Sequence, residues 1–266
     1  MTPEPQTPDP AKRSNPAAKT PKAVKVLVRN LTKSFGSLLV LDNLNFVVYA
    51  GELLCLVGPT GCGKTTFLNC LTGFLPLTAG EILVDGQKAS FKKGDLGFVF
   101  QESSTIPWLT VYDNVAFGLK IKKTPPEVIK ERVERILTVV GLNPFKDLYP
   151  RELSASLDQR VALAREFATQ PNLLLMDEPY GQLDIKLRYY LEDELRRIQE
   201  REGTTVAFVT HNIEEAVYLA DRILVLTQKP ATIKEEVIVT LPRPRRFDDP
   251  SFVAIRDQVT AAIQWW

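Results

Sequence analysis

The residues best suited to chemistry form one glycine-rich stretch, which reads Gly58-Pro59-Thr60-Gly61-Cys62-Gly63-Lys64-Thr65-Thr66. Its first eight residues fit the spacing G-x-x-x-x-G-K-[ST] of a phosphate-binding loop. Glycines let backbone N–H groups turn toward phosphate oxygens, and a following helix adds the positive end of its dipole. We therefore expect the stretch to bind a nucleoside triphosphate, with Lys64 on the β- and γ-phosphates and the Thr65 hydroxyl on Mg²⁺.

A second pair of chemical groups follows an apolar run much later in the chain. Residues 173–176 read Leu-Leu-Leu-Met, and Asp177 and Glu178 come directly after them. An acid at the end of a buried strand suits a Mg²⁺ partner, usually through water, and the next acid is placed to polarise an attacking water molecule. The sequence predicts that Asp177 helps to hold the metal and that Glu178 is the general base of a hydrolysis.

Strands and a helix must position these groups, and the apolar pattern predicts both. The unbroken apolar run at 53–57 indicates a strand that is covered on both faces and ends at the loop, and a helix is expected to start near Thr66. Further strands are expected at residues 24–28, 44–48, 82–100, 173–176 and 205–209. Strand and helix alternate around a helical stretch at about 102–170, so we expect an α/β fold with an inserted helical subdomain.

The composition excludes several classes of protein. The chain has 266 residues, 44% of them hydrophobic and 24% charged, which excludes global disorder. Its formal net charge of +1 argues against a nucleic-acid partner. No apolar run approaches the roughly 18–20 residues that span a bilayer, and the first residues lack a signal-peptide pattern. We expect a protein that stays in the cytosol.

The cysteines and the histidine narrow the chemistry further. The three cysteines, at 55, 62 and 70, match no metal or redox spacing, so a disulfide framework or a zinc site is not expected. With His211 as the one histidine, a metal must be held by oxygen ligands, which suits Mg²⁺. Cys55 is interpreted as a small buried hydrophobic residue of a strand.

Together with other short runs, these motifs make the chain resemble an ATP-binding subunit of an ABC transporter over about residues 26–245. The resemblance implies a P-loop NTPase core of the ABC type with antiparallel β strands, and ATP and Mg²⁺ as cofactors. It implies that Gln101 meets the metal and the water, and that the loop of Asp184 crosses a dimer interface. It also implies that His211 contacts the γ-phosphate, and that Phe35 stacks on adenine. From the residues alone, Phe35 fits the core equally well.

The chain departs from the family at the signature segment, which reads Leu153-Ser154-Ala155-Ser156-Leu157-Asp158-Gln159-Arg160-Val161. The family pattern has two glycines where this chain has Ala155 and Ser156, and a base where it has Asp158. In the family this segment completes the partner subunit's site at a helix N-terminus. Ser154 is expected to cap that helix and to contact phosphate. The added Cβ atoms and the acid predict a weakened signature.

Several runs place the resemblance in the nitrate, sulfonate and taurine importer branch: Pro107–Val111, Asp113–Gly118, His211–Ala216 and Leu241–Arg245. This implies an ATPase that powers import of a small anion. The implied partners are a second ATP-binding subunit (an identical copy or a relative), transmembrane permease subunits and, indirectly, a solute-binding protein. The implied location is the cytoplasmic face of the inner membrane, as a peripheral protein.

Two other functions are compatible with these motifs. The altered signature suits a low-turnover regulatory subunit of a heterodimeric transporter. A non-transport ABC ATPase of DNA repair or translation is the other, but such proteins carry paired cassettes or long coiled-coil inserts.

The two ends of the chain are expected to differ from the ATP-binding domain at 24–245. Residues 1–23 contain six prolines and four basic residues, which predicts a disordered tail. Residues 246–266 are expected to form a helical extension with Phe252, Val259 and Trp266 on one face. Docking of this helix onto its own domain and binding to a membrane surface both fit the pattern, and we expect docking.

Overall fold

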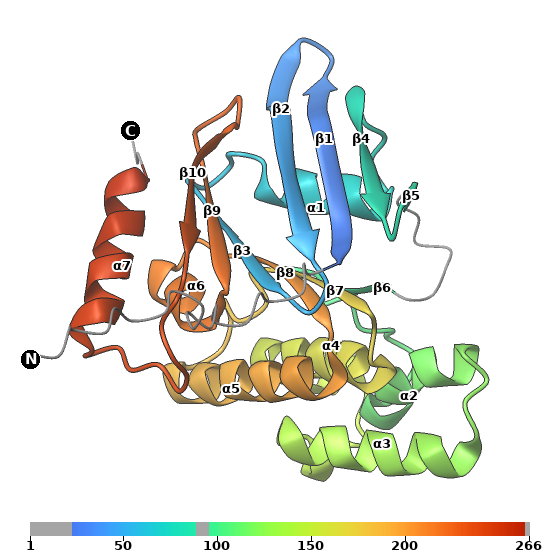
Figure 1. Cartoon of the computed structure of the whole chain (residues 1–266). Helices are drawn as coiled ribbons and strands as arrows, with labels where there is room; N and C mark the ends of the chain where they lie inside the picture. Colours follow the sequence, from blue (N-terminus) through green and yellow to red (C-terminus); the bar gives the residue numbers. More distant parts are fainter. Residues whose placement is uncertain (1–22, 89–95, 264–266) are drawn as a thin grey trace, which may run out of the picture.

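The computed structural model describes residues 23–88 and 96–263. Residues 1–22 of the predicted tail, residues 89–95 of the strand region expected at 82–100, and Trp266 lie outside the described residues. Within them the chain forms two sheets with helices packed around the larger one (Figure 1).

The smaller sheet is antiparallel and has the order β2-β1-β4-β5. Its strands are β1 (Val24–Phe35), β2 (Leu38–Tyr49), β4 (Ala79–Val84) and β5 (Gln87–Lys88). Val26 and Val28 are buried while their neighbours are more exposed, so the alternation that predicted a half-buried strand is confirmed. This sheet places Phe35, at the end of β1, close to the glycine-rich loop.

The larger sheet has the order β10-β9-β3-β8-β7-β6 and is parallel except for β10. Its strands are β3 (Leu53–Val57), β6 (Leu96–Val99), β7 (Leu173–Asp177), β8 (Thr205–Val209), β9 (Arg222–Leu226) and β10 (Ile233–Ile238). Every residue of β3, β7, β8 and β9 is buried, as expected for strands covered on both faces. The α/β fold with antiparallel strands is therefore confirmed.

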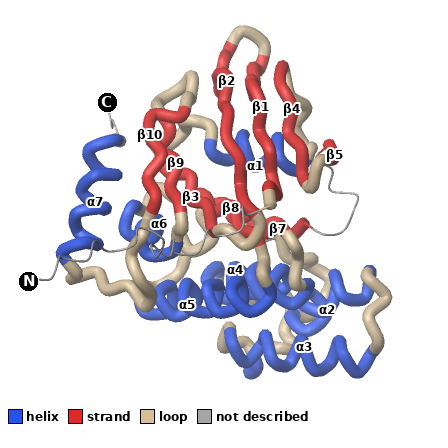
Figure 2. The backbone as a smooth tube through the Cα atoms, in the orientation of Figure 1, coloured by secondary structure: helices blue, strands red, loops and turns tan. Residues whose placement is uncertain are grey.

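Two hydrophobic cores lie on opposite faces of the larger sheet. In β3, Leu53, Cys55 and Val57 face one core, and Leu54 and Leu56 face the other. The first core joins the sheet to α4 (Ala155–Thr169), α5 (Ile185–Glu202) and α6 (Ile213–Leu219). The second joins it to the antiparallel sheet and to α1 (Lys64–Thr72). Figure 2 shows the long helices on the face opposite β1, β2 and β4.

The expected helical insert is formed by α2 (Val111–Ile121), α3 (Pro126–Val139), the short helices η2 (Asn143–Phe145) and η3 (Pro150–Glu152), and α4. The buried Asn114 ties this insert to the preceding loop, because its side-chain amide donates to the carbonyl oxygens of Ile106, Leu109 and Thr110. In Figure 1, α2 and α3 lie at the end of the molecule away from β1 and β2.

The last helix, α7 (Pro250–Ala262), packs against α6 and β10. Phe252 and Val259 are buried in the first core, so the described part of the helix docks onto its own domain. The helix ends at Ala262, earlier than the apolar pattern up to Trp266 suggested. Among the helices in the described ranges, none has the length and apolar character needed to cross a membrane.

Candidate nucleotide-binding site

The glycine-rich loop connects the end of β3 to the start of α1, as the sequence predicted. Gly61 and Gly63 have φ angles of 75° and 124°, where L side chains are strained. A Cβ on Gly63 would lie 2.8 Å from Leu41 Cδ2, so this glycine also lets β2 approach the loop closely. No side chain caps the N-terminus of α1, which leaves its first backbone N–H groups for a ligand.

Lys64 is buried and reaches back over its own loop. Its Nζ donates to the carbonyl oxygens of Gly58 at 2.9 Å and Pro59 at 3.2 Å. Two neutral carbonyl groups are weak partners for a buried ammonium, whereas phosphate oxygens bind it in charge-assisted hydrogen bonds. The loop therefore holds a cation in a position that suits an anionic ligand.

A pocket of about 530 Å³ opens beside the loop. Of the predicted site residues, it is lined by Phe35, Thr60, Gly61, Gly63, Lys64, Thr65, Thr66, Gln101, Glu178 and His211. These residues come from β1, the loop, α1 and the segments that follow β6, β7 and β8. The fold thus brings together groups that are up to 176 positions apart in the sequence, as between Phe35 and His211.

The pocket also contains residues that the sequence reasoning missed. Leu38 and Val40 of β2 line it beside Phe35, and Lys229 lines it from the turn after β9. Lys229 also lines a neighbouring hollow together with Pro59 and Cys62. No spacing in the sequence points to Lys229, because only the pairing of β9 with β3 carries it to the loop.

Asp177 lies at the end of β7 behind the pocket and is 2% exposed. Its Oδ1 atom is buried without a hydrogen-bond partner among the described residues, and its carboxylate is hydrogen-bonded to the Thr65 side chain. Burial raises the pKa of Asp177, and the bond to Thr65 opposes that shift. An orphaned carboxylate oxygen beside a hydroxyl is the donor set of a hard divalent cation, so these residues fit Mg²⁺.

In the described ranges, no group of three or more His, Cys, Asp or Glu side chains is arranged to hold a metal. The set of Thr65 and Asp177 is therefore incomplete by itself. Phosphate oxygens and water complete such a set where Mg²⁺ binds together with a nucleotide.

Glu178 is the meeting point of three loops at the edge of the sheet. Its Oε2 atom lies 2.9 Å from Nδ1 of His211 and accepts a hydrogen bond of 3.4 Å from Nε2 of Gln101. Its backbone N–H donates to Val209 O at 2.9 Å, which ties the end of β7 to the end of β8. The three side chains are thus placed to act on one small molecule in the pocket.

Phe35 presents an open aromatic surface at the other end of the pocket. The residue is 46% exposed, and Lys33 Nζ lies 4.6 Å from the centroid of its ring. Lys33 itself is buried and donates to Pro76 O at 2.8 Å, so it holds the ring from one side. The position suits stacking of a planar base, and the core reading of Phe35 is wrong.

The predicted residues Gly58, Pro59, Cys62, Asp177, Ser154 and Asp184 do not line this pocket. Ser154 and Asp184 also lie apart from the glycine-rich loop, at the starts of α4 and α5. Each is the N-cap of a helix: Ser154 Oγ accepts from Leu157 N at 3.3 Å in α4, and Asp184 Oδ1 accepts from Leu187 N at 3.0 Å in α5. The predicted cap by Ser154 is confirmed. Asp158, in the first turn of α4, accepts a hydrogen bond of 2.7 Å from the Thr105 hydroxyl, so its charge is partly engaged within the chain.

The thiol of the loop cysteine is buried, so only the backbone of Cys62 is placed to take part in the predicted nucleotide binding. Cys62 is 2% exposed, and burial raises the pKa of its thiol. A neutral buried thiol is a packing group, and Cys55 and Cys70 are buried and free in the same way.

Comparison with known proteins identifies the family to which the chain belongs. Residues 41–181 match the family described as ABC transporter. An uncharacterized ABC transporter ATP-binding protein of Methanocaldococcus jannaschii is 44% identical over 240 residues, 89% of this chain and 90% of that protein. The aliphatic sulfonates import ATP-binding protein of Bacillus cereus is 37% identical over 243 residues, 91% of this chain and 96% of that protein.

Solved structures agree. A dimeric bacterial ABC transporter cassette is similar with a TM-score of 0.74 and 31% identity, over 82% of this chain and 100% of that one. The same figures hold for a dimeric post-hydrolysis state of an ATP-binding cassette bound to ADP and Pi. With a loop, a pocket and an acidic pair of this arrangement, the chain belongs to the ABC transporter family, as one of its ATP-binding and ATP-hydrolysing cassettes.

Proposed function

We propose that this cassette powers an importer of a small anion of the sulfonate type. The proposal is supported by the sulfonate-import relative of Bacillus cereus and by the runs at Pro107–Val111 and Leu241–Arg245. Nitrate and taurine are the other substrates of the branch that the sequence resembles. The cassette does not itself touch the transported anion in this scheme, because permease subunits and a solute-binding protein do so.

In this proposal each residue of the pocket has a separate role in binding or hydrolysing ATP. Phe35 holds the base, Lys64 and the N-terminus of α1 bind the β- and γ-phosphates, and Thr65 and Asp177 hold Mg²⁺. The observation that carries this assignment is the contact of Glu178 Oε2 with His211 Nδ1 and Gln101 Nε2 at the mouth of the pocket. Glu178 orients and deprotonates the attacking water, and His211 and Gln101 keep the carboxylate in place.

Ser154 and Asp184 act on a second subunit. Both lie at exposed helix N-termini outside the pocket, and helix N-termini bind phosphate well. In a head-to-tail dimer they face the nucleotide that is bound by the partner. The cassette then sits at the cytoplasmic face of the membrane, against permease subunits that are contacted through the Gln101 loop and the helical insert.

Substitution of Lys64 tests the ATPase part of the proposal. Lys64→Ala should reduce ATP hydrolysis by about 100-fold or more, because it removes the ammonium that neutralises developing phosphate charge. Lys88→Ala removes an exposed lysine of β5 and should leave the rate unchanged. Equal rates in all three proteins would overturn the site.

Uptake by cells tests the substrate. A strain that lacks this gene should lose uptake of a labelled aliphatic sulfonate, and the wild-type gene should restore it while Lys64→Ala does not. Normal sulfonate uptake in the deletion strain, together with an active purified ATPase, would reject the substrate and leave the ATPase standing.

A further inference from the structure

A second hollow, of about 340 Å³, lies between α5, α6 and the segment that follows β10. Its walls include Asp193, Arg196, Glu200, Tyr218, Arg243 and Arg245, and none of these residues lines the nucleotide pocket. Arg243 and Arg245 belong to the run Leu241–Arg245. This run has no role in the ATP hydrolysis described above. The hollow thus gathers arginines at a place that the hydrolysis does not use.

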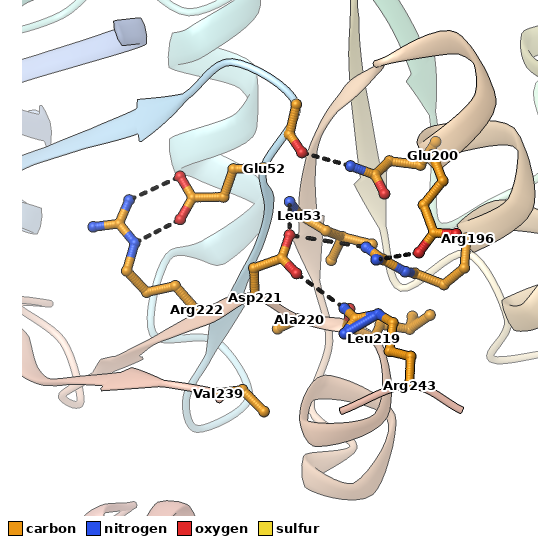
Figure 3. A network of polar contacts seen from close by, with 12 residues as sticks. Glu52, Leu53, Arg196, Glu200, Leu219, Ala220, Asp221, Arg222, Val239 and Arg243 are labelled. Atoms are coloured by element: carbon orange, nitrogen blue, oxygen red, sulfur yellow. Dashed lines mark hydrogen bonds and ion pairs between the residues drawn. The ribbon is translucent and has the colours of Figure 1, made fainter. Parts of the chain in front are cut away.

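A neighbouring arginine shows how a fully paired guanidinium looks in this protein. Arg222 donates from Nε and Nη2 to the two carboxylate oxygens of Glu52 at 2.7 Å and 3.1 Å (Figure 3). Its Nη1 donates to Glu236 at 3.0 Å. Burial by itself lowers the pKa of Arg222, but the bonds to Glu52 and Glu236 raise it. Every nitrogen of this guanidinium donates to an acceptor within the protein, so none is left to bind a ligand.

The arginines of the hollow are bonded less completely. Arg196 Nη2 donates to Glu200 at 2.9 Å, and Arg243 Nη2 donates to Leu219 O at 2.7 Å and to Asp221 at 3.0 Å (Figure 3). Four buried donor atoms have no hydrogen-bond acceptor among the described residues: Arg196 Nε and Nη1, Arg243 Nε and Arg245 Nε.

Arg245 is the most buried of these arginines, with 7% of its surface exposed. Its Nη1 donates to the carbonyl oxygens of Val217, Tyr218 and Ala220 at the end of α6, and its Nη2 to Val239 O. Those acceptors are all neutral. The guanidinium therefore enters the hollow with its charge uncompensated by a bonded carboxylate.

The three charges also repel one another. Burial, followed by the charge of Arg243, lowers the pKa of Arg245 to about 9. Burial, followed by the charge of Arg196, lowers the pKa of Arg243. One buried and two partly buried cations at short range are stabilised when anions lie among them.

The acids nearby are already engaged or lie at the rim. Asp221 is 3.0 Å from Arg243 and 3.8 Å from Arg196, and it also accepts the backbone N–H of Leu53 at 2.9 Å. Asp193 accepts from the Tyr218 hydroxyl at 2.6 Å, and the Glu200 side chain is 59% exposed. The hollow thus holds more buried cationic donors than buried anionic acceptors.

We propose that this hollow binds a small oxyanion through Arg196, Arg243 and Arg245. Sulfate, phosphate and a sulfonate group share the chemistry that it recognises, which is three or more oxygens with a delocalised negative charge. Such oxygens accept short, charge-assisted hydrogen bonds from guanidinium N–H groups. The guanidinium groups of these three arginines, which line the hollow, supply the donors. The proposal does not rest on the substrate of the transporter.

Calorimetric titration tests the site. The protein is first saturated with Mg·ADP, so that the phosphate-binding loop is occupied, and is then titrated with sodium sulfate, phosphate or methanesulfonate at an ionic strength held constant with chloride. We expect one saturable site per chain. The anion that binds tightest identifies the source as inorganic sulfate, inorganic phosphate or an organic sulfonate.

Three variants make the test specific. Arg196→Met should weaken the binding by about tenfold or more, because it removes charge-assisted hydrogen bonds. Arg201→Met removes the same charge from an exposed position of the same helix and should leave binding unchanged. Glu200→Gln removes the negative charge that competes for Arg196 and should tighten binding, an effect that damage to the fold would not give.

Diffraction gives the location. In crystals soaked with selenate, an anomalous peak should lie within hydrogen-bond distance of Arg196 and Arg243. No saturable binding above that of chloride, equal losses in Arg196→Met and Arg201→Met, or ordered water alone in the hollow would each overturn the proposal.

Discussion

Glu178 holds its place against the local preference of the backbone. Its φ angle is 44°, in the left-handed region that costs a non-glycine residue about 1 kcal/mol or more. The hydrogen bond from its N–H to Val209 O and the contact with His211 hold it there. Strain of this kind is typical of active-site residues, because the surrounding contacts must fix a geometry that the chain alone would not adopt.

Substitution of Glu178 tests its role as the base. Glu178→Gln keeps the shape and the ATP contacts but removes the proton acceptor, so hydrolysis should fall by about 100-fold or more while ATP stays bound. Size-exclusion chromatography with Mg·ATP should then show a stable dimer. Glu102→Gln, a change at an exposed neighbouring acid, serves as the control. Hydrolysis at the wild-type rate in Glu178→Gln would assign the base to another residue.

The N-terminus of α4 carries the departure from the family pattern. Ala155 is exposed and Ser156 is half-buried, so their Cβ atoms lie at the surface that faces a partner in the proposed dimer. Ser154 still caps the helix, and Asp158 is bonded to Thr105. The altered segment thus keeps a regular helix start and differs in how closely a phosphate can approach it.

Restoring the glycines tests the weakened signature. Ala155→Gly together with Ser156→Gly should raise the ATPase rate of the purified homodimer severalfold, because the helix N-terminus can then approach the γ-phosphate. The same change should lower stability by about 1 kcal/mol, since glycine disfavours a helix. Ala164→Gly, deep in the same helix, gives the stability loss without the gain. An unchanged rate that is already normal would show that the glycines never limited turnover.

Helices α5 and α6 meet at a pair of buried carboxyl groups. Glu192 is fully buried and Glu215 is 6% exposed. Burial, followed by the nearby charge of Glu215, raises the pKa of Glu192 to about 9. Burial also raises the pKa of Glu215, while Thr210, Arg188 and His211 act against this shift. Around neutral pH the pair retains a proton that water would remove.

This pair should make stability depend on pH. The pKa of Glu192 has its ordinary value of 4.5 in the unfolded chain and is about 9 in the folded chain, so stability should fall as pH rises through that interval. Glu192→Gln removes the ionisable group and should flatten the decline by roughly 1–3 kcal/mol between pH 5 and pH 8. Denaturant unfolding at several pH values measures it, with the half-exposed Glu214→Gln as the control. Parallel profiles for the wild type and Glu192→Gln would contradict the shift.

The assembled transporter requires a contact that the isolated chain leaves open. Trp108 is 76% exposed, in the loop before α2 and near the Gln101 segment. Trp108→Ala should leave the ATPase rate and stability of the purified cassette within about twofold and 0.5 kcal/mol of the wild type. It should reduce co-purification with the permease, since exposed aromatic side chains dominate interfaces. Ile238→Ala, an exposed apolar change on β10, should leave co-purification intact. Full co-purification of Trp108→Ala would place the contact elsewhere.

The sequence predicts much of the fold and of the nucleotide site. The central strands are continuous apolar runs, and the glycine-rich loop has a fixed spacing. The sequence did not predict the residues that reach their sites only through the packing of distant segments. Lys229 and the arginines of the second hollow are examples. Local rules also failed once. Residues 124–127 read Thr-Pro-Pro-Glu, a pattern that predicts a capping box with Thr124 as the N-cap of α3, but Pro125 takes that place. The residue before a proline avoids the helical region, so Pro125, which precedes Pro126, cannot be the first residue of the helix.

The order of the strands has a consequence for how the protein is made. β3 is synthesised early, yet its neighbours in the sheet, β8 and β9, leave the ribosome about 150 residues later. Until then the five apolar residues of β3 have no partner strand. Such an exposed apolar segment is a typical binding site for a chaperone. Glu178 and His211 arrive equally late. A nascent chain therefore passes most of its synthesis without a nucleotide pocket, and the ribosome releases a cassette that becomes able to use ATP only at the end.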